Sequence, residues 1–401
     1  SIMRDSPPDV SSLKPTLPHR LSGILARCFE KDPSQRFQQA EELRDELKKL
    51  REPAVRQEDE DTRPSIAVLR FVNMSPDPEQ EYFCEGIAEE LINGLARVKN
   101  LRVASRTSSF QFSGEAQDIR EIGSKLGVKT LLEGSVRKAG NFLRVAAQLV
   151  NVEDGYHLWS ERFDREMKDV FAIQDEIAES IVNALEMTLS PKERRAIQNV
   201  ATRNVEAYDF YLRGRKFFYQ RTRRNMEFAV QMFEKAIGLD PHYALAFAGI
   251  ADCHSFLYMH SDPIEENRQK SEEASRKALE LDPELAEAHA SRGLALLLAE
   301  DFEGAEAEFE RAIQLNTQLF EAYYFYARAC YTQGKFAKAA QLFEQASEVR
   351  PDDYQAPILL RQALVAMGTP PEQAIQVSIQ ALQKVEKHLE LHPDDVRALY
   401  L

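Results

Sequence analysis

The chain has 401 residues, 43% hydrophobic and 29% charged, with a formal net charge of −14 at pH 7. A chain of this length is too long to fold around a single hydrophobic core, so two or three domains are predicted. The negative charge argues against a nucleic-acid partner, which needs a basic face for the phosphates. No apolar run approaches the roughly 18 residues that span a bilayer, so we expect a cytoplasmic protein without a membrane segment. The cysteines lie far apart and predict neither a metal site nor a disulfide framework.

Two amphipathic helices are predicted near the amino terminus, over residues 17–30 and 35–50. The stretch CFEKDPSQRF (28–37), followed by a helix, resembles the last two helices of a bacterial serine/threonine protein kinase C-lobe. In that family the arginine matching Arg36 forms a buried ion pair with the glutamate that ends the activation segment. The resemblance implies that residues 1–51 are a partial kinase C-lobe, from a parent kinase that would use ATP and Mg²⁺.

None of the phosphate-handling motifs of such kinases occurs in these residues: no Gly-rich loop, strand lysine, catalytic-loop aspartate or metal-binding aspartate. Phosphoryl transfer depends on positioning and metal electrostatics, so we expect no enzyme activity and no cofactor in this chain. The chain starts at Ser1 and ends within a new helical pattern, so it is interpreted as a piece of a longer protein. Residues 52–63 (EPAVRQEDEDTR) are charged and polar, and they predict an extended linker.

Residues 64–191 show a different periodicity, which predicts an α/β domain with a mixed sheet. The expected strands cover residues 65–71, 101–104, 130–137, 142–150 and 157–164, and the expected helices cover 85–98, 119–126 and 170–189. Turns at Gly140 and Gly155 separate the last three strands.

The same segment resembles a known family in IAVLRF (66–71), EYFCEGIAEELINGLARV (81–98) and the long run from Leu131 to Arg165. It is similar to the TolB amino-terminal-like domain, which is found upstream of helical-repeat arrays in bacterial signalling proteins. The resemblance implies a non-catalytic sensory or assembly domain, with no catalytic residues to carry over.

A helical repeat runs through residues 205–401. Two small residues and one ring recur on a single helix face in three places: Ala229, Phe233, Ala236; Ala305, Phe309, Ala312; and Ala339, Phe343, Ala346. The last two triplets are 34 residues apart, as are the helix ends near Pro283, Thr317 and Pro351. This is the period of tetratricopeptide (TPR) repeats. It predicts an all-α TPR superhelix of about five repeats, the last one truncated, with a concave groove.

The first helix of each repeat lines the groove in TPR proteins. This places the candidate peptide-binding residues at Glu287, Leu294, Tyr324, Arg328 and Tyr331. The last three are separated by four and three residues and so share one helix face. Aromatic and arginine side chains dominate interface energetics, which favours a binding surface. The alternative is that the same side chains pack between repeats.

A basic run within this acidic chain contains Arg213, Arg215, Arg221 and Arg224. One interpretation is a contact with an acidic or phosphorylated segment, including one from the kinase domain itself. The other is a solvated helix end and loop.

Together these features predict the regulatory and protein-interaction region of a cytosolic bacterial serine/threonine kinase, whose TPR groove recruits a protein or peptide partner. The alternative is the rear half of a TPR-containing transcription regulator or of an adenylate cyclase-type signalling protein.

Overall fold

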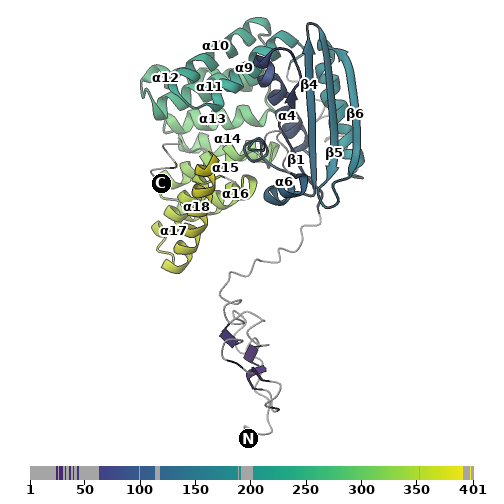
Figure 1. Ribbon diagram of the computed structural model, residues 1–401. Helices are drawn as coiled ribbons and strands as arrows, with labels where there is room; N and C mark the ends of the chain where they lie inside the picture. The colour runs from purple at the N-terminus through teal and green to yellow at the C-terminus, as the bar shows by residue number, and fades with distance from the viewer. Residues whose placement is uncertain are drawn as a thin grey trace. The chain divides into compact units, whose positions relative to one another are not determined.

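The structure is a computed structural model that describes residues 63–98, 100–112, 118–187, 189–190, 202–351 and 353–391, with isolated positions between 24 and 44 and residue 398. It divides into two compact units, residues 1–63 and 64–401. In the first unit Arg36 is exposed. The kinase-like helices and the linker predicted there lie mostly outside the described residues. The second unit carries the sheet and the helical array (Figure 1).

A mixed sheet begins the second unit, which confirms the predicted α/β class. Its strands are β1 (Ser65–Val68), β2 (Val72–Asn73), β3 (Arg102–Val103), β4 (Thr130–Ala139), β5 (Phe142–Asn151) and β6 (His157–Glu166). The strand order is β3-β1-β4-β5-β6, and β2 also pairs with β4. β1 runs parallel to β3 and β4, whereas β5 and β6 are antiparallel additions. Gly140 has a φ of 57° in the β4–β5 turn, a conformation that suits glycine.

Helices cover the two faces of the sheet unequally. α4 (Glu81–Leu95) and α7 (Val170–Ala184) bury one face in a core that includes Val68, Leu132 and Val145. On the opposite face, α6 (Ile119–Leu126) covers only the region of Ala67 and Leu131. The short α5 (Arg106–Ser109) precedes α6 in the chain. The side chains on the opposite face of β6 are therefore exposed, including those of Leu158, Ser160, Arg162 and Asp164.

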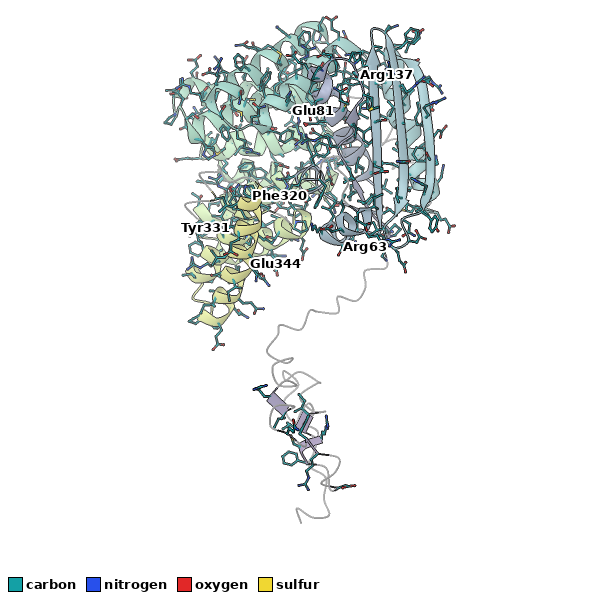
Figure 2. All side chains as sticks on the ribbon, viewed as in Figure 1. Arg63, Glu81, Arg137, Phe320, Tyr331 and Glu344 are labelled. Atoms are coloured by element: carbon teal, nitrogen blue, oxygen red, sulfur yellow. The ribbon has the colours of Figure 1, made fainter. Side chains whose placement is uncertain are left out.

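The rest of the unit is helical. Its described helices are α9 (Val205–Tyr219), α10 (Arg223–Leu239), α11 (Ala244–His260), α12 (Glu265–Leu281), α13 (Ala286–Leu298), α14 (Phe302–Leu315), α15 (Phe320–Thr332), α16 (Phe336–Val349), α17 (Gln355–Ala366) and α18 (Pro371–Leu391). The nine small and aromatic residues of the three repeat triplets are all fully buried. Figure 2 shows Phe320 and Tyr331 in the array and Arg137 on the sheet.

Glycine lets paired helices approach the repeat phenylalanines closely. A Cβ atom on Gly293 would lie 2.8 Å from the ring of Phe309, and one on Gly214 would lie 2.5 Å from the ring of Phe233. The ring therefore fills the space that the missing side chain leaves. α12 departs from this pattern, because Ser275 stands where other repeats have the phenylalanine. One turn earlier, the hydroxyl oxygens of Ser271 and Ser255 are 2.7 Å apart.

The sheet domain and the array share one hydrophobic core. Tyr208 and Leu212 of α9 belong to the same buried cluster as Ile87 of α4. A Cβ atom on Gly86 would lie 2.5 Å from the side chain of Leu212, so α4 and α9 are packed as tightly as neighbouring helices of one domain.

Candidate peptide-binding groove and domain junction

The structure brings two of the predicted groove residues together on α15. The guanidinium of Arg328 lies 5.9 Å from the ring centroid of Tyr324 and 5.8 Å from that of Phe325. Its Nη1 lies 4.0 Å from Sδ of Met259 on α11. Among the described residues, no carboxylate lies within ion-pair distance of Arg328. A partly buried guanidinium between rings can donate hydrogen bonds to a carboxylate or carbonyl oxygen of a ligand.

Tyr324 also takes part in packing between repeats. Its ring stacks on Phe320, with centroids 5.4 Å apart, and meets Phe343 edge-on at 6.2 Å. Its hydroxyl donates a hydrogen bond of 3.1 Å to Oε1 of Gln355 on α17. The alternative of packing between repeats is therefore observed for Tyr324, whose ring is half-buried, and its role in peptide binding stays a prediction.

The remaining predicted groove residues are placed differently. Tyr331 is half-buried and packs edge-on against Phe336, at 5.3 Å between centroids. Leu294 is 4% exposed and lies in the core of the array, so it offers little surface to a ligand. Glu287 is partly buried, and within the described structure its Oε2 has no hydrogen-bond partner.

Carboxyl groups recur on the first helices of the repeats. Asp252 of α11 accepts a hydrogen bond of 2.7 Å from the hydroxyl of Ser291 on α13. Burial raises the pKa of Asp252 to about 7, although this hydrogen bond opposes the shift. Glu321 of α15 pairs with Arg350 at 2.9 Å, and that guanidinium lies 3.9 Å over the ring of Phe320. The groove side of the array thus carries charge of both signs.

The sheet domain adds a further carboxyl group close to these. Burial, followed by repulsion from Glu89, raises the pKa of Glu90 on α4 to about 7. Glu287 of α13 contributes to the same repulsion. A residue of the sheet domain therefore shares an electrostatic environment with the first helices of the array.

The basic run is divided between two environments. Nη2 of Arg213 pairs with Asp209 at 2.9 Å, and Arg215 faces α4, as described below. Arg221 lies 5.5 Å over the ring of Phe218, and Arg224 lies 5.4 Å over that of Phe228. The run is not one continuous surface, because the junction with the sheet domain uses its first two members.

A buried ionic cluster joins the sheet domain to the array. Glu89 of α4 is 6% exposed and accepts hydrogen bonds from Nε of Arg215 at 3.1 Å and from the hydroxyl of Tyr219 at 2.7 Å. Arg106 lies 3.1 Å from its other carboxylate oxygen. Burial would raise the pKa of Glu89, but Arg215 and Arg106 outweigh it and lower that pKa. The carboxylate is therefore ionised and held by two cations.

Sequence reasoning missed this cluster. Its only signal was Glu89 itself, a charged residue among the apolar positions of the helix over 81–95. A second contact lies beside it, where the hydroxyl of Tyr82 donates a hydrogen bond of 2.7 Å to Asp209. Lys138 of β4 reaches the same carboxylate at 3.2 Å.

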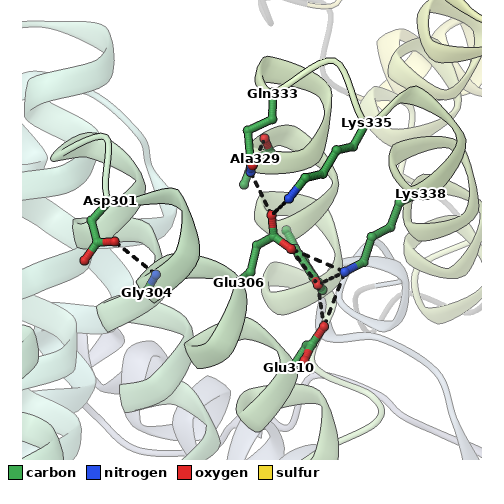
Figure 3. A network of polar contacts seen from close by, with 9 residues as sticks. Asp301, Gly304, Glu306, Glu310, Ala329, Gln333, Lys335 and Lys338 are labelled. Carbon is green, nitrogen blue, oxygen red and sulfur yellow. Dashed lines mark hydrogen bonds and ion pairs between the residues drawn. The ribbon is translucent and has the colours of Figure 1, made fainter.

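Polar contacts also tie successive repeats together (Figure 3). Glu306 of α14 contacts Lys335, Lys338 and the side-chain amide of Gln333, which donates at 2.9 Å. Burial opposes ionisation of Glu306, but hydrogen bonds from Lys335, Gln333 and Lys338 lower its pKa to about 2. Glu310 accepts from the hydroxyl of Tyr326 in the same network. These contacts join α14 to α15, to the turn after it and to α16.

The described residues contain no group of three or more His, Cys, Asp and Glu side chains that could hold a metal ion. Nor does any helix in the described part of the chain have the length and apolar character needed to cross a membrane. A hollow of about 670 Å³ lies at the turn end of β4–β6, and two of its charged side chains, Lys168 and Glu166, pair with each other at 2.9 Å.

A family model described as tetratricopeptide repeat matches residues 296–356. Together with the 34-residue period, this match supports TPR repeats in the array. The sequence is also 37% identical over 246 residues to a protein named "Putative adenylate cyclase 3" from Rhizobium meliloti (strain 1021). That match covers 61% of this chain, and the chain spans 42% of the length of that relative.

Two solved structures are similar at low identity. The crystal structure of MamA has 24% identity and a TM-score of 0.34, over 43% of this chain and 96% of that one. A thermophilic TPR protein of Thermus thermophilus has 17% identity and a TM-score of 0.36, over 50% of this chain and 95% of that one.

Proposed function

We propose that the TPR array binds an extended or helical segment of another protein, through Tyr324 and Arg328 on α15. The observation that carries this proposal is the environment of Arg328, whose described contacts are two rings and a thioether. Guanidinium groups in partly buried sites normally meet a carboxylate or a carbonyl. The neighbouring Arg350 already has Glu321 at 2.9 Å, whereas Arg328 is placed to receive its acceptor from a ligand.

The sheet domain contributes to this function by holding the first repeat in place. Its α4 shares a core with α9, and the Glu89 cluster fixes the contact through hydrogen bonds. We infer a sensory or assembly role for residues 64–191, as expected from the TolB-like resemblance. A change in the position of α4 would move the first repeat, and with it the end of the groove.

The parent protein is proposed to be a cytoplasmic bacterial signalling protein. Residues 28–37 favour a serine/threonine kinase, whereas the name of the Rhizobium meliloti relative favours the cyclase-type alternative. A single assay separates the two. Purified full-length protein is incubated with ATP and Mg²⁺, and the products are resolved into phosphoprotein and cyclic AMP. Phosphoprotein alone supports the kinase, and cyclic AMP alone supports the cyclase.

The groove proposal is tested by affinity capture followed by substitution. Residues 64–401 serve as bait, and the captured partner is titrated by calorimetry against the wild type and Arg328→Met. Truncating an interface anchor costs about 2 kcal/mol, which corresponds to roughly 30-fold in affinity. Arg276→Met is the matched control, because Arg276 is 60% exposed on α12 and pairs with Glu280. We expect the control to bind like the wild type.

The contradicting result is full affinity in Arg328→Met with an unchanged melting temperature. In that case the basic side chains outside the junction become the next candidates. An Arg221→Met/Arg224→Met variant that loses affinity would then place binding at the turn before α10 and at the start of that helix.

A further inference from the structure

β6 forms an open edge of the sheet (Figure 1). It pairs with β5 along one side, and no strand in the described part of the chain pairs with its other side. The strand is ten residues long, from His157 to Glu166. A free edge of this length presents a row of unpaired N–H and C=O groups and is a template for another strand.

The pairing with β5 determines which peptide groups face this edge. The backbone N–H of Met167 donates to the carbonyl of Asn141 at 2.8 Å, and the register continues through Val145 opposite Phe163. In an antiparallel ladder the peptide groups of successive residues point to opposite sides of the strand. The odd-numbered residues of β6 therefore bond to β5. The even-numbered residues from Ser160 to Glu166 present their peptide groups to the free edge, and the register shift opposite Leu149 and Val150 ends this alternation before Trp159.

The charges on β6 have an order that is complementary to itself. On either side of Phe163 the sequence reads Glu161-Arg162 and Asp164-Arg165. Consider two antiparallel copies of the strand, related by a twofold axis that passes between their Phe163 residues. This arrangement brings Arg162 opposite Asp164 of a second copy, and Glu161 opposite Arg165 of that copy. Each of these opposite-charge contacts occurs twice in the pair.

Other antiparallel registers that hydrogen-bond the same peptide groups have less favourable charge pairs. Sliding the second strand by two residues places Arg162 opposite Arg162, or Asp164 opposite Asp164. Like charges directly opposite each other are destabilising, whereas opposite charges stabilise a strand pair. We propose that two copies of this chain associate through β6 in the register centred on Phe163, which joins their sheets into one.

Charged side chains on an edge strand often prevent pairing, so their arrangement decides the outcome. Here the charges are exposed enough to meet a second strand, with side-chain exposures of 66% for Arg162, 46% for Asp164 and 47% for Arg165. Their contacts within the chain are those of surface pairs, such as Arg162 with Asp164 at 3.3 Å and Arg165 with Glu176 at 3.7 Å. Exposed pairs of this kind are weak and can be shared with an added strand. Phe163 is 2% exposed and stays in its own core.

Charge reversal tests the register directly. Residues 64–401 are analysed by size-exclusion chromatography with light scattering over a range of concentrations. The wild type is expected to dimerise. R162D and D164R should each raise the dimer dissociation constant at least tenfold, because each puts like charges opposite each other. The double variant R162D/D164R restores complementarity and should recover dimerisation. A monomeric wild type, or single variants that dimerise like the wild type, would overturn the proposal.

A disulfide provides a second measurement that does not depend on affinity. Glu161 and Arg165 of the second copy form a non-hydrogen-bonded pair, with Cα atoms about 4.5 Å apart, which suits a disulfide. Within one chain these positions are four residues apart on an extended strand, about 13 Å, too far to bridge.

The variant E161C/R165C is prepared in residues 64–401, which lack the partly exposed Cys28 and keep the three buried cysteines. Mild oxidation should yield a covalent dimer from E161C/R165C and little from either single variant. Circular dichroism verifies that each variant is folded. A folded double variant that stays monomeric on a denaturing gel contradicts the register, as does equal cross-linking by the single variants.

Discussion

The two ends of the TPR array differ in what covers them. At the first repeat, Tyr208, Tyr211 and Leu212 of α9 are at most 5% exposed, because α4 and the core of the sheet domain lie against them. At the last described repeat, Ile375 and Ile379 of α18 are 56% and 52% exposed. Each repeat of a solenoid buries its apolar face against its neighbours, so an end repeat needs a different cover.

This difference shows that a solenoid cap need not resemble the repeat that it covers. A sheet domain with its own core supplies apolar residues at α4, and it adds the ion pair between Glu89 and Arg215. The ion pair gives the junction a specific geometry, since two buried charges must meet within hydrogen-bond distance. The predictions that follow compare the capped front of the array with its interior and with the exposed face of α18.

The largest effect is expected for the interior. Phe309 is fully buried against Gly293 and lies 5.9 Å from the ring of Tyr326. Phe309→Ala should lower the free energy of unfolding by about 3–5 kcal/mol, since it leaves a cavity between two repeats. Urea titration of residues 64–401 measures this loss. Phe142→Ala is the control, because that ring is 71% exposed and its removal should leave the midpoint unchanged.

At the front junction, Arg215→Met should cost about 2 kcal/mol. It removes a cation from the buried carboxylate of Glu89, although Arg106 and Tyr219 remain. Adding Glu89→Gln should recover part of this loss, because the remaining group is then neutral. Thermal unfolding of the single and double variants measures both the loss of stability and its recovery. If Arg215→Met unfolds like the wild type, the ion pair does not contribute to the junction.

The effect of substituting Asp252, on the groove side of the array, should depend on pH. The folded-state pKa of Asp252 is about 7, above its unfolded value near 3.8. Its protonated form therefore favours the fold below pH 3.8, and this contribution is lost as the pH rises toward 7. Asp252→Asn should gain melting temperature relative to the wild type at pH 8 and less at pH 5. A constant difference at all pH values would mean that Asp252 titrates normally.

The smallest effect is expected on the exposed face of α18. Ile379→Ser changes a side chain that is 52% exposed on α18, so the free energy of unfolding should shift by less than about 0.5 kcal/mol. The same urea titration checks this. A loss above about 1 kcal/mol would show that this surface is covered in solution, and the comparison between the two ends would then fail.

Sequence reasoning located the repeats because their signal is periodic. The Ala-Phe-Ala triplets and the helix ends recur at fixed spacing, so the residues that pack between helices stand out. The helix over 119–126 and the three long strands were placed with similar success, since alternating burial follows from the pleat of a sheet. The strand predicted over 65–71 is shorter in the structure and ends at Val68.

The junction was less accessible to sequence reasoning because its contacts join distant residues. Arg215 looked like one member of a basic run, and only the fold reveals that Glu89, far earlier in the chain, lies beside it. Leu294 was assigned to the groove from helix periodicity, yet it is buried in the core of the array. Periodicity identifies a helix face, but the neighbour that covers this face depends on tertiary packing.

The close approach of α4 and α9 also limits which side chains the junction tolerates. A side chain at Gly86 would overlap Leu212 at 2.5 Å, so a larger residue at one position requires a smaller one at the other. A substitution at either position is therefore felt on both sides of the junction. In packing terms, α9 belongs to the core of the sheet domain as much as to the array.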